Sequence, residues 1–364
     1  PVHIAVPDEK RTNPHLADSD GDGENDGVEV FHGTDPTDDA SSSAAFGNPL
    51  VDGARSGRTR DIARLISLVE SGSDDVPDVM RELASSAGSA RVIGITGSPG
   101  VGKSTTTSAI SSRFRAAGLR GGGLAVDPSS PSSGGALLGD RIRMQQHATD
   151  EGVFIRSMAS RGHLGGLAAT TPQALRVLDA AGFDVVLIET VGVGQSEVEV
   201  AGSADTTLVL LAPGMGDGIQ AAKAGILEVG DVFAVNKADR DGADSTVREL
   251  RAMVALGDRS SQAWIPPVVK TVASTGEGID GLMAALDDHR AWLLASGQLE
   301  ARRIQRARDE IEAIALASLR RGLAVGDRQV RFDGLAAEVA AGRTDAFTAA
   351  ADLITDLLAD RPPR

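Results

Sequence analysis

The sequence predicts an α/β protein with a mostly parallel sheet and helices on both of its faces. Between residues 91 and 295, short and nearly unbroken apolar runs alternate with helical segments, a pattern typical of parallel strands buried on both sides. A helix and a short glycine-rich connection separate the first two runs. We therefore expect the second strand to lie parallel to the first and beside it.

The central α/β domain is expected to span residues 91–295. Its expected strands are residues 92–96, 124–126, 185–188, 207–211, 232–235 and 268–272. Its expected helices are residues 104–117, 172–181, 219–229, 245–256 and 279–294. The alternation of the two kinds of segment is what makes a single layered domain the natural interpretation.

Helical segments flank this domain on both sides. Residues 48–90 predict an N-terminal helical extension and residues 296–364 a C-terminal helical arm, with expected helices over residues 49–70, 76–84, 298–321 and 334–360. Apolar residues recur on the faces of the C-terminal helices: Ile304, Ile311, Ile314, Leu319, Leu335, Val339, Phe347 and Leu353. Since a finished α/β domain need not cover such faces, we expect the arm to hold a homodimer together.

Composition and charge exclude several classes of protein. The 364 residues include 36 basic and 51 acidic residues, a net charge of −15, which argues against nucleic acid or an anionic membrane as the main partner. The absence of cysteine excludes disulfides, thiolate metal sites and cysteine nucleophiles. Because the sequence shows neither a membrane-spanning apolar run nor a signal pattern, we expect a cytoplasmic protein.

A complete phosphate-binding motif follows the first expected strand. Residues 97–104 read GSPGVGKS and fit G-x-x-x-x-G-K-[ST] between a strand and a helix. Backbone N–H groups of such a loop cradle phosphates, and we expect Lys103 to contact the β- and γ-phosphates and Ser104 to bind Mg²⁺. The expected nucleotide-binding residues are Gly100, Val101, Gly102, Lys103, Ser104 and Thr105. The predicted fold is therefore that of a P-loop NTPase.

Two later strands end in a carboxylate. Asp127 follows the second strand and Glu189 the third, and ligands of open α/β sheets bind at the carboxyl ends of the strands. We expect both strands to lie beside the P-loop strand. Carboxylate oxygens suit Mg²⁺, so Asp127 and Glu189 are candidates for its surroundings.

A guanine-recognition motif follows the fifth expected strand. Asn236, Lys237 and Asp239 fit N-K-x-D, and the Asp239 carboxylate can accept hydrogen bonds from guanine N1–H and N2–H₂, an arrangement that adenine cannot supply. After the last strand, Ser274 and Thr275 lie in a loop that looks like the companion loop contacting guanine O6. The sequence therefore predicts GTP, not ATP, as the ligand.

Together these motifs resemble the MeaB/MMAA (ArgK-type) GTPases of the SIMIBI class, over about residues 48–360. Beyond the P-loop and the guanine motif, the resemblance is carried by segments 126–131, 134–141, 156–162 and 189–195. It implies a homodimeric G-protein chaperone that hydrolyses GTP. Its partner would be an adenosylcobalamin-dependent acyl-CoA mutase, typically methylmalonyl-CoA mutase, whose cofactor loading it gates and which it protects or reactivates.

The resemblance also implies roles for single residues. Ser104, Asp127 and Glu189 would surround Mg²⁺, and the Gly192 N–H would contact the γ-phosphate. The implied catalytic residues are Lys103, Asp127, Asp140, Glu189 and Gly192. Asp140 would belong to a first switch, and residues 213–223 to an additional switch in which Lys223 communicates with the partner.

The acidic first segment, residues 1–47, carries a separate motif. Residues 18–29 fit D-x-[DN]-x-[DN]-G-x₅-E, whose carboxylates can converge on Ca²⁺. The candidate Ca²⁺ residues are Asp18, Asp20, Asp22, Glu24, Asp26 and Glu29. The segment looks more like a thrombospondin type-3 repeat than an EF-hand, because the residues before it do not look helical; an acidic tail with chance spacing is the alternative.

Two other functions stay open on the sequence alone. The first is a metal-insertion GTPase for nickel or zinc; such proteins usually carry Cys or His relays near the switches, whereas this chain has no cysteine and six scattered histidines. The second is a calcium-dependent binding module with an inactive GTPase domain, which absence of GTP hydrolysis would favour.

Overall fold

The computed structural model describes residues 48–86, 88–128, 150–160, 170–190, 202–214, 226–256, 263–323 and 327–359. They form two compact units, one ending at Glu300 and one beginning at Ala301. The candidate Ca²⁺ residues Asp18 to Glu29 lie outside the described residues.

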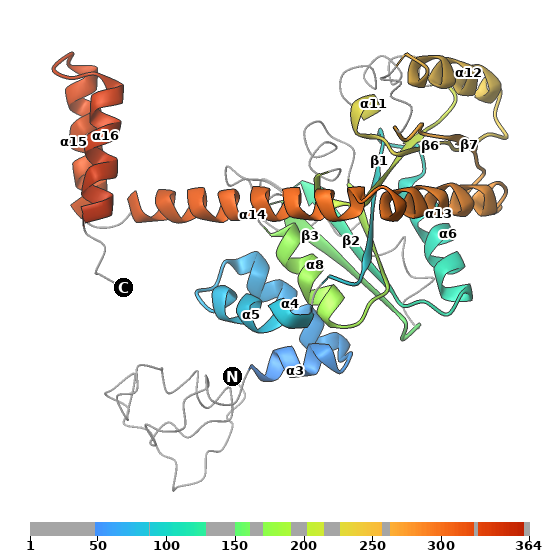
Figure 1. Ribbon diagram of the computed structural model, residues 1–364, viewed down its shortest axis with the longest axis horizontal. Helices are drawn as coiled ribbons and strands as arrows, with labels where there is room; N and C mark the ends of the chain where they lie inside the picture. The colour runs from blue at the N-terminus through green and yellow to red at the C-terminus, as the bar shows by residue number, and fades with distance from the viewer. Residues whose placement is uncertain are drawn as a thin grey trace, which may run out of the picture. The chain divides into compact units, whose positions relative to one another are not determined.

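A seven-stranded parallel sheet is the centre of the first unit (Figure 1). Its strands are β1 (Arg91–Thr96), β2 (Gly121–Pro128), β3 (Val153–Ser160), β4 (Val185–Thr190), β5 (Thr206–Leu211), β6 (Val232–Val235) and β7 (Val268–Lys270). Their order across the sheet is β3-β2-β4-β1-β5-β6-β7. The prediction of a parallel α/β sheet is confirmed.

Two details of the strand prediction were wrong. First, β4 lies between β1 and β2, with Ile93 of β1 and Gly123 of β2 both in register with Leu187. The aliphatic strand β4 is buried throughout, whereas β2 begins with three glycines that offer no side chains for a central position. Second, β3 was missed, because this edge strand is only partly buried and Arg156 interrupts its apolar pattern.

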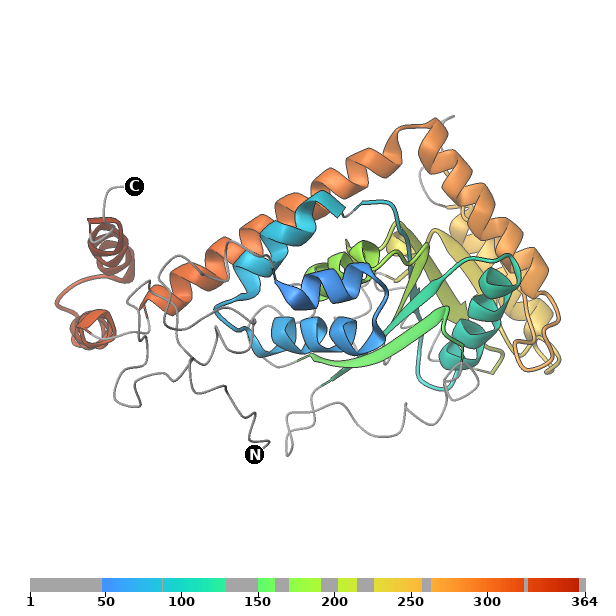
Figure 2. The same cartoon turned by 90° about the horizontal axis from the view of Figure 1, so that it is seen from below.

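Two layers of helices cover the sheet (Figure 2). On one face, α6 (Lys103–Ala116) and α13 (Ile279–Ala295) pack against alternate strand residues such as Ile93 and Ile95. On the other face lie α8 (Thr171–Ala180) and α12 (Ala243–Val254), and α11 (Ile226–Val229) precedes β6. This alternation of side chains between two buried faces explains the unbroken apolar runs in the sequence.

The N-terminal helical extension, residues 48–90, is part of the first unit and packs beside α8. It consists of α3 (Pro49–Arg55), α4 (Thr59–Ser71), α5 (Val76–Leu83) and the 3₁₀ turn η2 (Ala84–Ser86). The expected single helix over 49–70 was wrong, because the chain turns at Gly57, where φ is +78°, a value that disfavours other residues. Leu65 and Ile66 of α4 are fully buried in the same core cluster as Leu178 of α8.

The second unit is helical. It contains α14, which begins at the boundary between the units (Gln298–Leu323), α15 (Asp327–Ala340) and α16 (Ala346–Ala359). The expected single helix over 334–360 was wrong: Gly342 has φ +70°, and Asp345 caps α16 by accepting hydrogen bonds from the Phe347 and Thr348 N–H groups at 2.9 and 3.0 Å. The Thr348 hydroxyl also donates to Asp345, at 2.6 Å. This hydrogen bond contributes most to lowering the pKa of Asp345, and the backbone N–H groups lower it further.

The apolar residues of this unit fall into two groups. Leu335 and Leu353, which were expected on an uncovered face, are buried between α15 and α16 together with Ala349. Other members of the expected face remain uncovered: Ile304 is 49% exposed, Ile311 68% and Phe347 89%. The helix pair thus has a small core of its own, and further apolar surface remains.

Candidate functional site

The P-loop, residues 97–104, leaves the carboxyl end of β1 and leads into α6. Two of its glycines are required by close approaches of other elements. A Cβ at Gly97 would lie 2.3 Å from the Leu210 carbonyl oxygen of β5, and a Cβ at Gly102 would lie 2.4 Å from Asn236 Nδ2. Both residues also have positive φ, so the loop can adopt this path only with glycine there.

The Lys103 side chain curls back over this loop. Its ammonium donates to the carbonyl oxygens of Gly97 at 2.6 Å and Ser98 at 3.2 Å, and the residue is only 8% exposed. Since Lys103 is also the first residue of α6, a positive charge and the N-terminus of a helix meet at one point. This is a site for an anion such as a phosphate chain.

Glu189, near the carboxyl end of β4, faces the first turn of α6. The side chain is 7% exposed; Oε1 accepts a hydrogen bond from Ser104 Oγ at 2.7 Å and Oε2 accepts one from Thr107 Oγ1 at 2.9 Å. A carboxylate and a hydroxyl this close form the oxygen-rich kind of donor set that Mg²⁺ prefers. The structure thus brings Ser104 and Glu189 together, as the sequence predicts.

Thr107 was missed by the sequence analysis. It lies three residues after Ser104 in α6, so both hydroxyls project from the same side of the helix. That spacing was a usable signal, since residues three apart on a helix are neighbours on its surface.

The guanine motif lies beside the P-loop at the end of β6. Asn236 is 3% exposed; its Nδ2 donates to the Val101 carbonyl oxygen at 2.8 Å, and its Oδ1 accepts from the Ala273 N–H at 3.0 Å. Lys237 donates from Nζ to the Gly100 carbonyl oxygen at 2.6 Å. Asn236 therefore ties together the P-loop, β6 and the loop after β7.

The groups predicted to read the base lie around these anchors. Asp239, Ser274 and Thr275 are exposed, and Thr275 Oγ1 donates to the Val272 carbonyl oxygen at 3.1 Å. The buried Asn236 and Ala273 next to them hold the two loops in place. Rigid anchors with exposed polar tips are suited to binding a planar polar ligand.

Several predicted site residues are not described. Asp127 belongs to β2 and is in register with Ala159 of β3, but its side chain lies outside the described residues. The same holds for the whole of Asp140, Gly192 and Lys223. The geometry of the site rests on the P-loop, Glu189 and the guanine motif.

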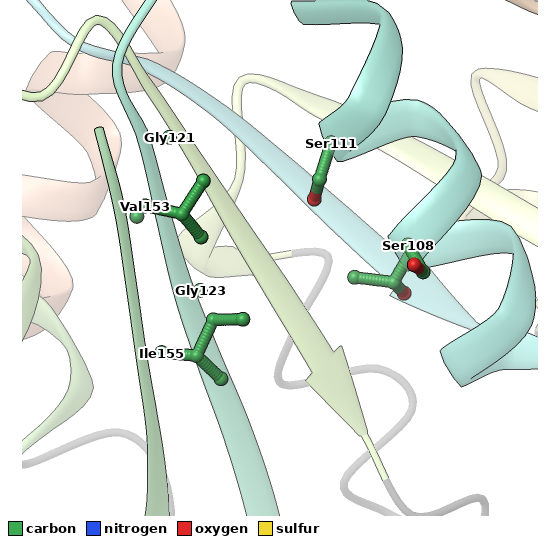
Figure 3. A pocket seen from close by; sticks show the side chains of 8 residues that line it. Ser108, Ser111, Gly121, Gly123, Val153 and Ile155 are labelled. Atoms are coloured by element: carbon green, nitrogen blue, oxygen red, sulfur yellow. The ribbon is translucent and has the colours of Figure 1, made fainter. Parts of the chain in front are cut away.

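A small open hollow lies next to α6, near the β3 edge of the sheet (Figure 3). Thr107, Ser108 and Ser111 of α6 line one side, and glycines of β2 with Val153 and Ile155 of β3 line the other. A Cβ at Gly121 would meet no atom within 4 Å. Among the residues that the structure describes, those lining the hollow are uncharged.

Two features are absent from the described residues. No group of three or more His, Asp or Glu side chains there could by itself hold a metal ion. Among the helices described, none is long and apolar enough to cross a membrane.

Comparison with known proteins adds the family context. The family model described as methylmalonyl-CoA mutase-associated GTPase MeaB matches residues 62–325, which include the P-loop, Glu189 and the guanine motif. A Pyrococcus abyssi protein that carries a GTPase name is 43% identical over 311 residues, covering 85% of this chain and 96% of that protein. The GTPase ArgK of Escherichia coli is 37% identical over 260 residues, covering 70% and 78%.

Two further matches concern a mammalian protein and a solved structure. The mouse protein named methylmalonic aciduria type A homolog, mitochondrial, is 40% identical over 214 residues, which are 58% of this chain and 52% of that protein. A crystal structure described as LAO/AO transport system kinase has a TM-score of 0.62 at 27% sequence identity, covering 85% of this chain and 96% of its own.

Proposed function

Because the chain belongs to the MeaB family of methylmalonyl-CoA mutase-associated GTPases, we propose that it is a GTP-hydrolysing chaperone of an adenosylcobalamin-dependent acyl-CoA mutase. It would gate the loading of the mutase cofactor and protect or reactivate the mutase. The observation that carries the proposal is the meeting of Lys103, Glu189 and the anchored guanine motif at one edge of the sheet.

In this proposal the P-loop and the guanine motif hold the nucleotide. Lys103 would exchange its loop carbonyls for the β- and γ-phosphates, with Gly100 to Thr105 supplying backbone N–H groups. Asp239 would accept hydrogen bonds from the guanine edge while Ser274 and Thr275 line its other side. Asn236 would take part from the same motif, and its hydrogen bonds hold the P-loop against the loop after β7.

The metal side of the site would consist of Ser104, Glu189 and Asp127. Ser104 Oγ and the Glu189 carboxylate already lie within 2.7 Å of each other, and oxygen donors of this kind fit Mg²⁺. The ion would neutralise phosphate charge during hydrolysis. Asp140 and Gly192 would contribute from the switch segments that flank the phosphates.

Base selectivity is the direct test of the nucleotide site. We expect GTP and GDP to bind in calorimetry while ATP at equal concentration fails to compete. Asp239→Asn should weaken guanine binding by about 100-fold, because a site built to pair polar groups discriminates by that order or more, and should favour xanthine nucleotides. Effective competition by ATP would contradict the assignment.

Coupling to a mutase is the test of the chaperone function. The protein is mixed with the cobalamin-dependent mutases of its genome, and GTP turnover, nucleotide affinity and cofactor transfer are measured. If GTP changes the affinity for the mutase, the mutase must change the affinity for GTP by the same factor. Lys223→Ala should reduce this coupling while leaving GDP affinity alone.

A negative result in that experiment has a definite meaning. If none of the mutases alters GTP turnover or nucleotide affinity and none co-purifies from the native cell, the chaperone function fails. The metal-insertion alternative then becomes the better explanation of a GTPase in this structural class.

We also propose a homodimer held by the C-terminal helices, in the cytoplasm. The support is the uncovered apolar surface on α14 and α16, where Ile311 is 68% exposed and Phe347 89%. In light scattering, Ile311→Asp in the full chain should shift the protein towards the monomer, and truncation after Ser296 should abolish the dimer. A dimer that survives both changes would place the interface elsewhere.

A further inference from the structure

We propose that Thr107 is a positioning residue for Mg²⁺-dependent GTP hydrolysis: it holds one oxygen of the Glu189 carboxylate so that the other stays on Ser104. The inference rests on the proposed function, because it concerns the metal side of that nucleotide site. Thr107 lies one helical turn beyond the P-loop motif itself.

The geometry is a carboxylate held between two hydroxyls of one helix. Ser104 Oγ donates to Oε1 at 2.7 Å and Thr107 Oγ1 donates to Oε2 at 2.9 Å. With both oxygens engaged, the carboxylate plane is fixed relative to α6. Rotation about the last bond of Glu189 would break both hydrogen bonds at once.

The position of the Thr107 proton follows from a count of donors and acceptors. Thr107 Oγ1 lies 3.0 Å from the Lys103 carbonyl oxygen as well as 2.9 Å from Glu189, yet a hydroxyl has one proton to donate. A hydrogen bond to an ionised carboxylate is about twice as strong as one between neutral groups. With Glu189 in the ionised form that a metal ligand requires, the proton is therefore on the Glu189 side.

Burial makes this hydrogen bond consequential. Thr107 is 5% exposed and Glu189 7%, so water cannot readily replace a lost donor at this place, and an unsatisfied buried carboxylate oxygen is costly. Without Thr107, the carboxylate would lose one of the two hydroxyl hydrogen bonds that fix its plane relative to Ser104. The residue that would bind Mg²⁺ would then lose its orientation.

The chain offers a closely matched control. Thr246 of α12 is also 5% exposed, and its Oγ1 likewise lies close to the carbonyl oxygen four residues earlier, that of Gly242, to which it donates at 3.1 Å. Thr246→Val removes the same kind of hydroxyl from the same kind of buried helix position. It does so without touching Glu189.

The experiment compares Thr107→Val, Thr107→Ser and Thr246→Val in the full chain. Release of a fluorescent GDP analogue is measured against Mg²⁺ concentration, alongside GTP turnover and urea unfolding. We expect Thr107→Val to raise the Mg²⁺ concentration at half-effect by about tenfold and to lower kcat by a similar factor, the usual scale for groups behind a metal ligand. GDP affinity in excess EDTA should stay within about twofold, and Thr107→Ser should restore the Mg²⁺ response.

Each outcome decides something. If the wild-type chain shows neither GTP hydrolysis nor Mg²⁺-sensitive release, the proposed function fails and this inference fails with it. If the wild type responds to Mg²⁺ but Thr107→Val responds equally, or if Thr107→Ser does not restore the response, only the positioning role is overturned. Loss of unfolding free energy without a change in Mg²⁺ response would show a structural role.

A second measurement covers the case in which Thr107→Val does not fold. Thr107→Ala is combined with Glu189→Gln in a double-mutant cycle on kcat. If Thr107 acts through Glu189, the double variant should be no slower than Glu189→Gln alone. Additive losses would contradict the proposal.

Discussion

The carboxyl edge of the sheet, where its parallel strands end, and its amino edge, where they begin, use acidic residues in different ways. At the carboxyl edge, Glu189 accepts hydrogen bonds from the side chains of Ser104 and Thr107. At the amino edge, Asp184, Asp205 and Asp231 each stand one residue before a strand, and each accepts a backbone N–H from a neighbouring segment. These donors are Arg120 at 2.7 Å, Val92 at 3.0 Å and Thr207 at 2.8 Å.

An aromatic cluster of Trp264, His289 and Trp292 also packs at the amino edge. His289 of α13 lies with Nδ1 2.9 Å from Thr206 Oγ1 and with Nε2 3.4 Å from Asp231 Oδ1. The two tryptophans, Trp264 and Trp292, pack beside the imidazole at ring-centre distances of 4.8 and 5.8 Å. Asp231 is thus enclosed by the side chains of this cluster, and Trp264 Nε1 donates to its carbonyl oxygen at 2.7 Å.

The difference teaches how to judge an acidic residue next to a strand. Backbone N–H groups at the start of a strand have fixed positions, so an acid placed there satisfies them and stabilises the sheet. Hydroxyl groups on a helix can turn towards a ligand, so an acid that they hold can exchange partners when one arrives. We therefore expect Glu189 to serve function and the three aspartates to serve stability.

The largest expected effect is that of Lys103→Ala at the carboxyl edge. Removing the ammonium should lower GTP turnover by about 100- to 1,000-fold, the scale found when one charge-stabilising group is lost from an active site. Nucleotide affinity should fall as well, because Lys103 would offset phosphate charge in the ground state and the transition state. Single-turnover kinetics and calorimetry measure the two effects, and unchanged GDP affinity would count against the assignment.

Glu189→Gln should have the next largest effect, and a different profile. Turnover should fall by about 10- to 100-fold, as for other changes that disturb the surroundings of a metal ligand, whereas GDP affinity should fall less than in Lys103→Ala. The same two assays in parallel separate the roles. Equal losses of GDP affinity in both variants would refute the division of roles at this edge.

Much of the fold and of this site could be predicted because the signals are local. The P-loop and the guanine motif are short runs, and residues in one run, such as Lys103 and Ser104, keep their relation in any fold that forms the loop. The parallel sheet followed from unbroken apolar runs. The prediction of the fold is confirmed, because the strand signals and the P-loop signal are each contained in a short run of residues, although the pairing of the strands is not.

What could not be predicted depends on distant partners. The place of β4 between β1 and β2 arises from competition among strands for the buried centre. The contact between Thr107 and Glu189 joins residues 82 positions apart. Likewise, Asp205 and Asp231 look like ordinary aspartates of loops in the sequence. Only the order of the strands shows which backbone N–H donates a hydrogen bond to each of them.

At the amino edge, Asp205→Ala and Asp231→Ala should lower stability and leave catalysis alone. Each substitution leaves a buried strand N–H without its acceptor, which costs about 1–3 kcal/mol. Urea unfolding monitored by circular dichroism gives the free energy of unfolding, and GTP turnover is measured well below the unfolding range. A specific loss of turnover in a fully folded variant would end the distinction between the edges.

Asp184→Ala should have the smallest effect, although its hydrogen bond to the Arg120 N–H is short at 2.7 Å. Asp184 is exposed, whereas Asp205 and Asp231 are 3% and 7% exposed, so water can take over the N–H of Arg120 when the carboxylate is removed. We expect a loss of about 0.5–1 kcal/mol, the net value of a hydrogen bond that solvent can replace. Asp184→Asn, which keeps an acceptor oxygen, should lose less. If Asp184→Ala instead destabilises the protein as much as Asp231→Ala, burial does not set the strength of these caps, and the bond length would be the better guide along this edge.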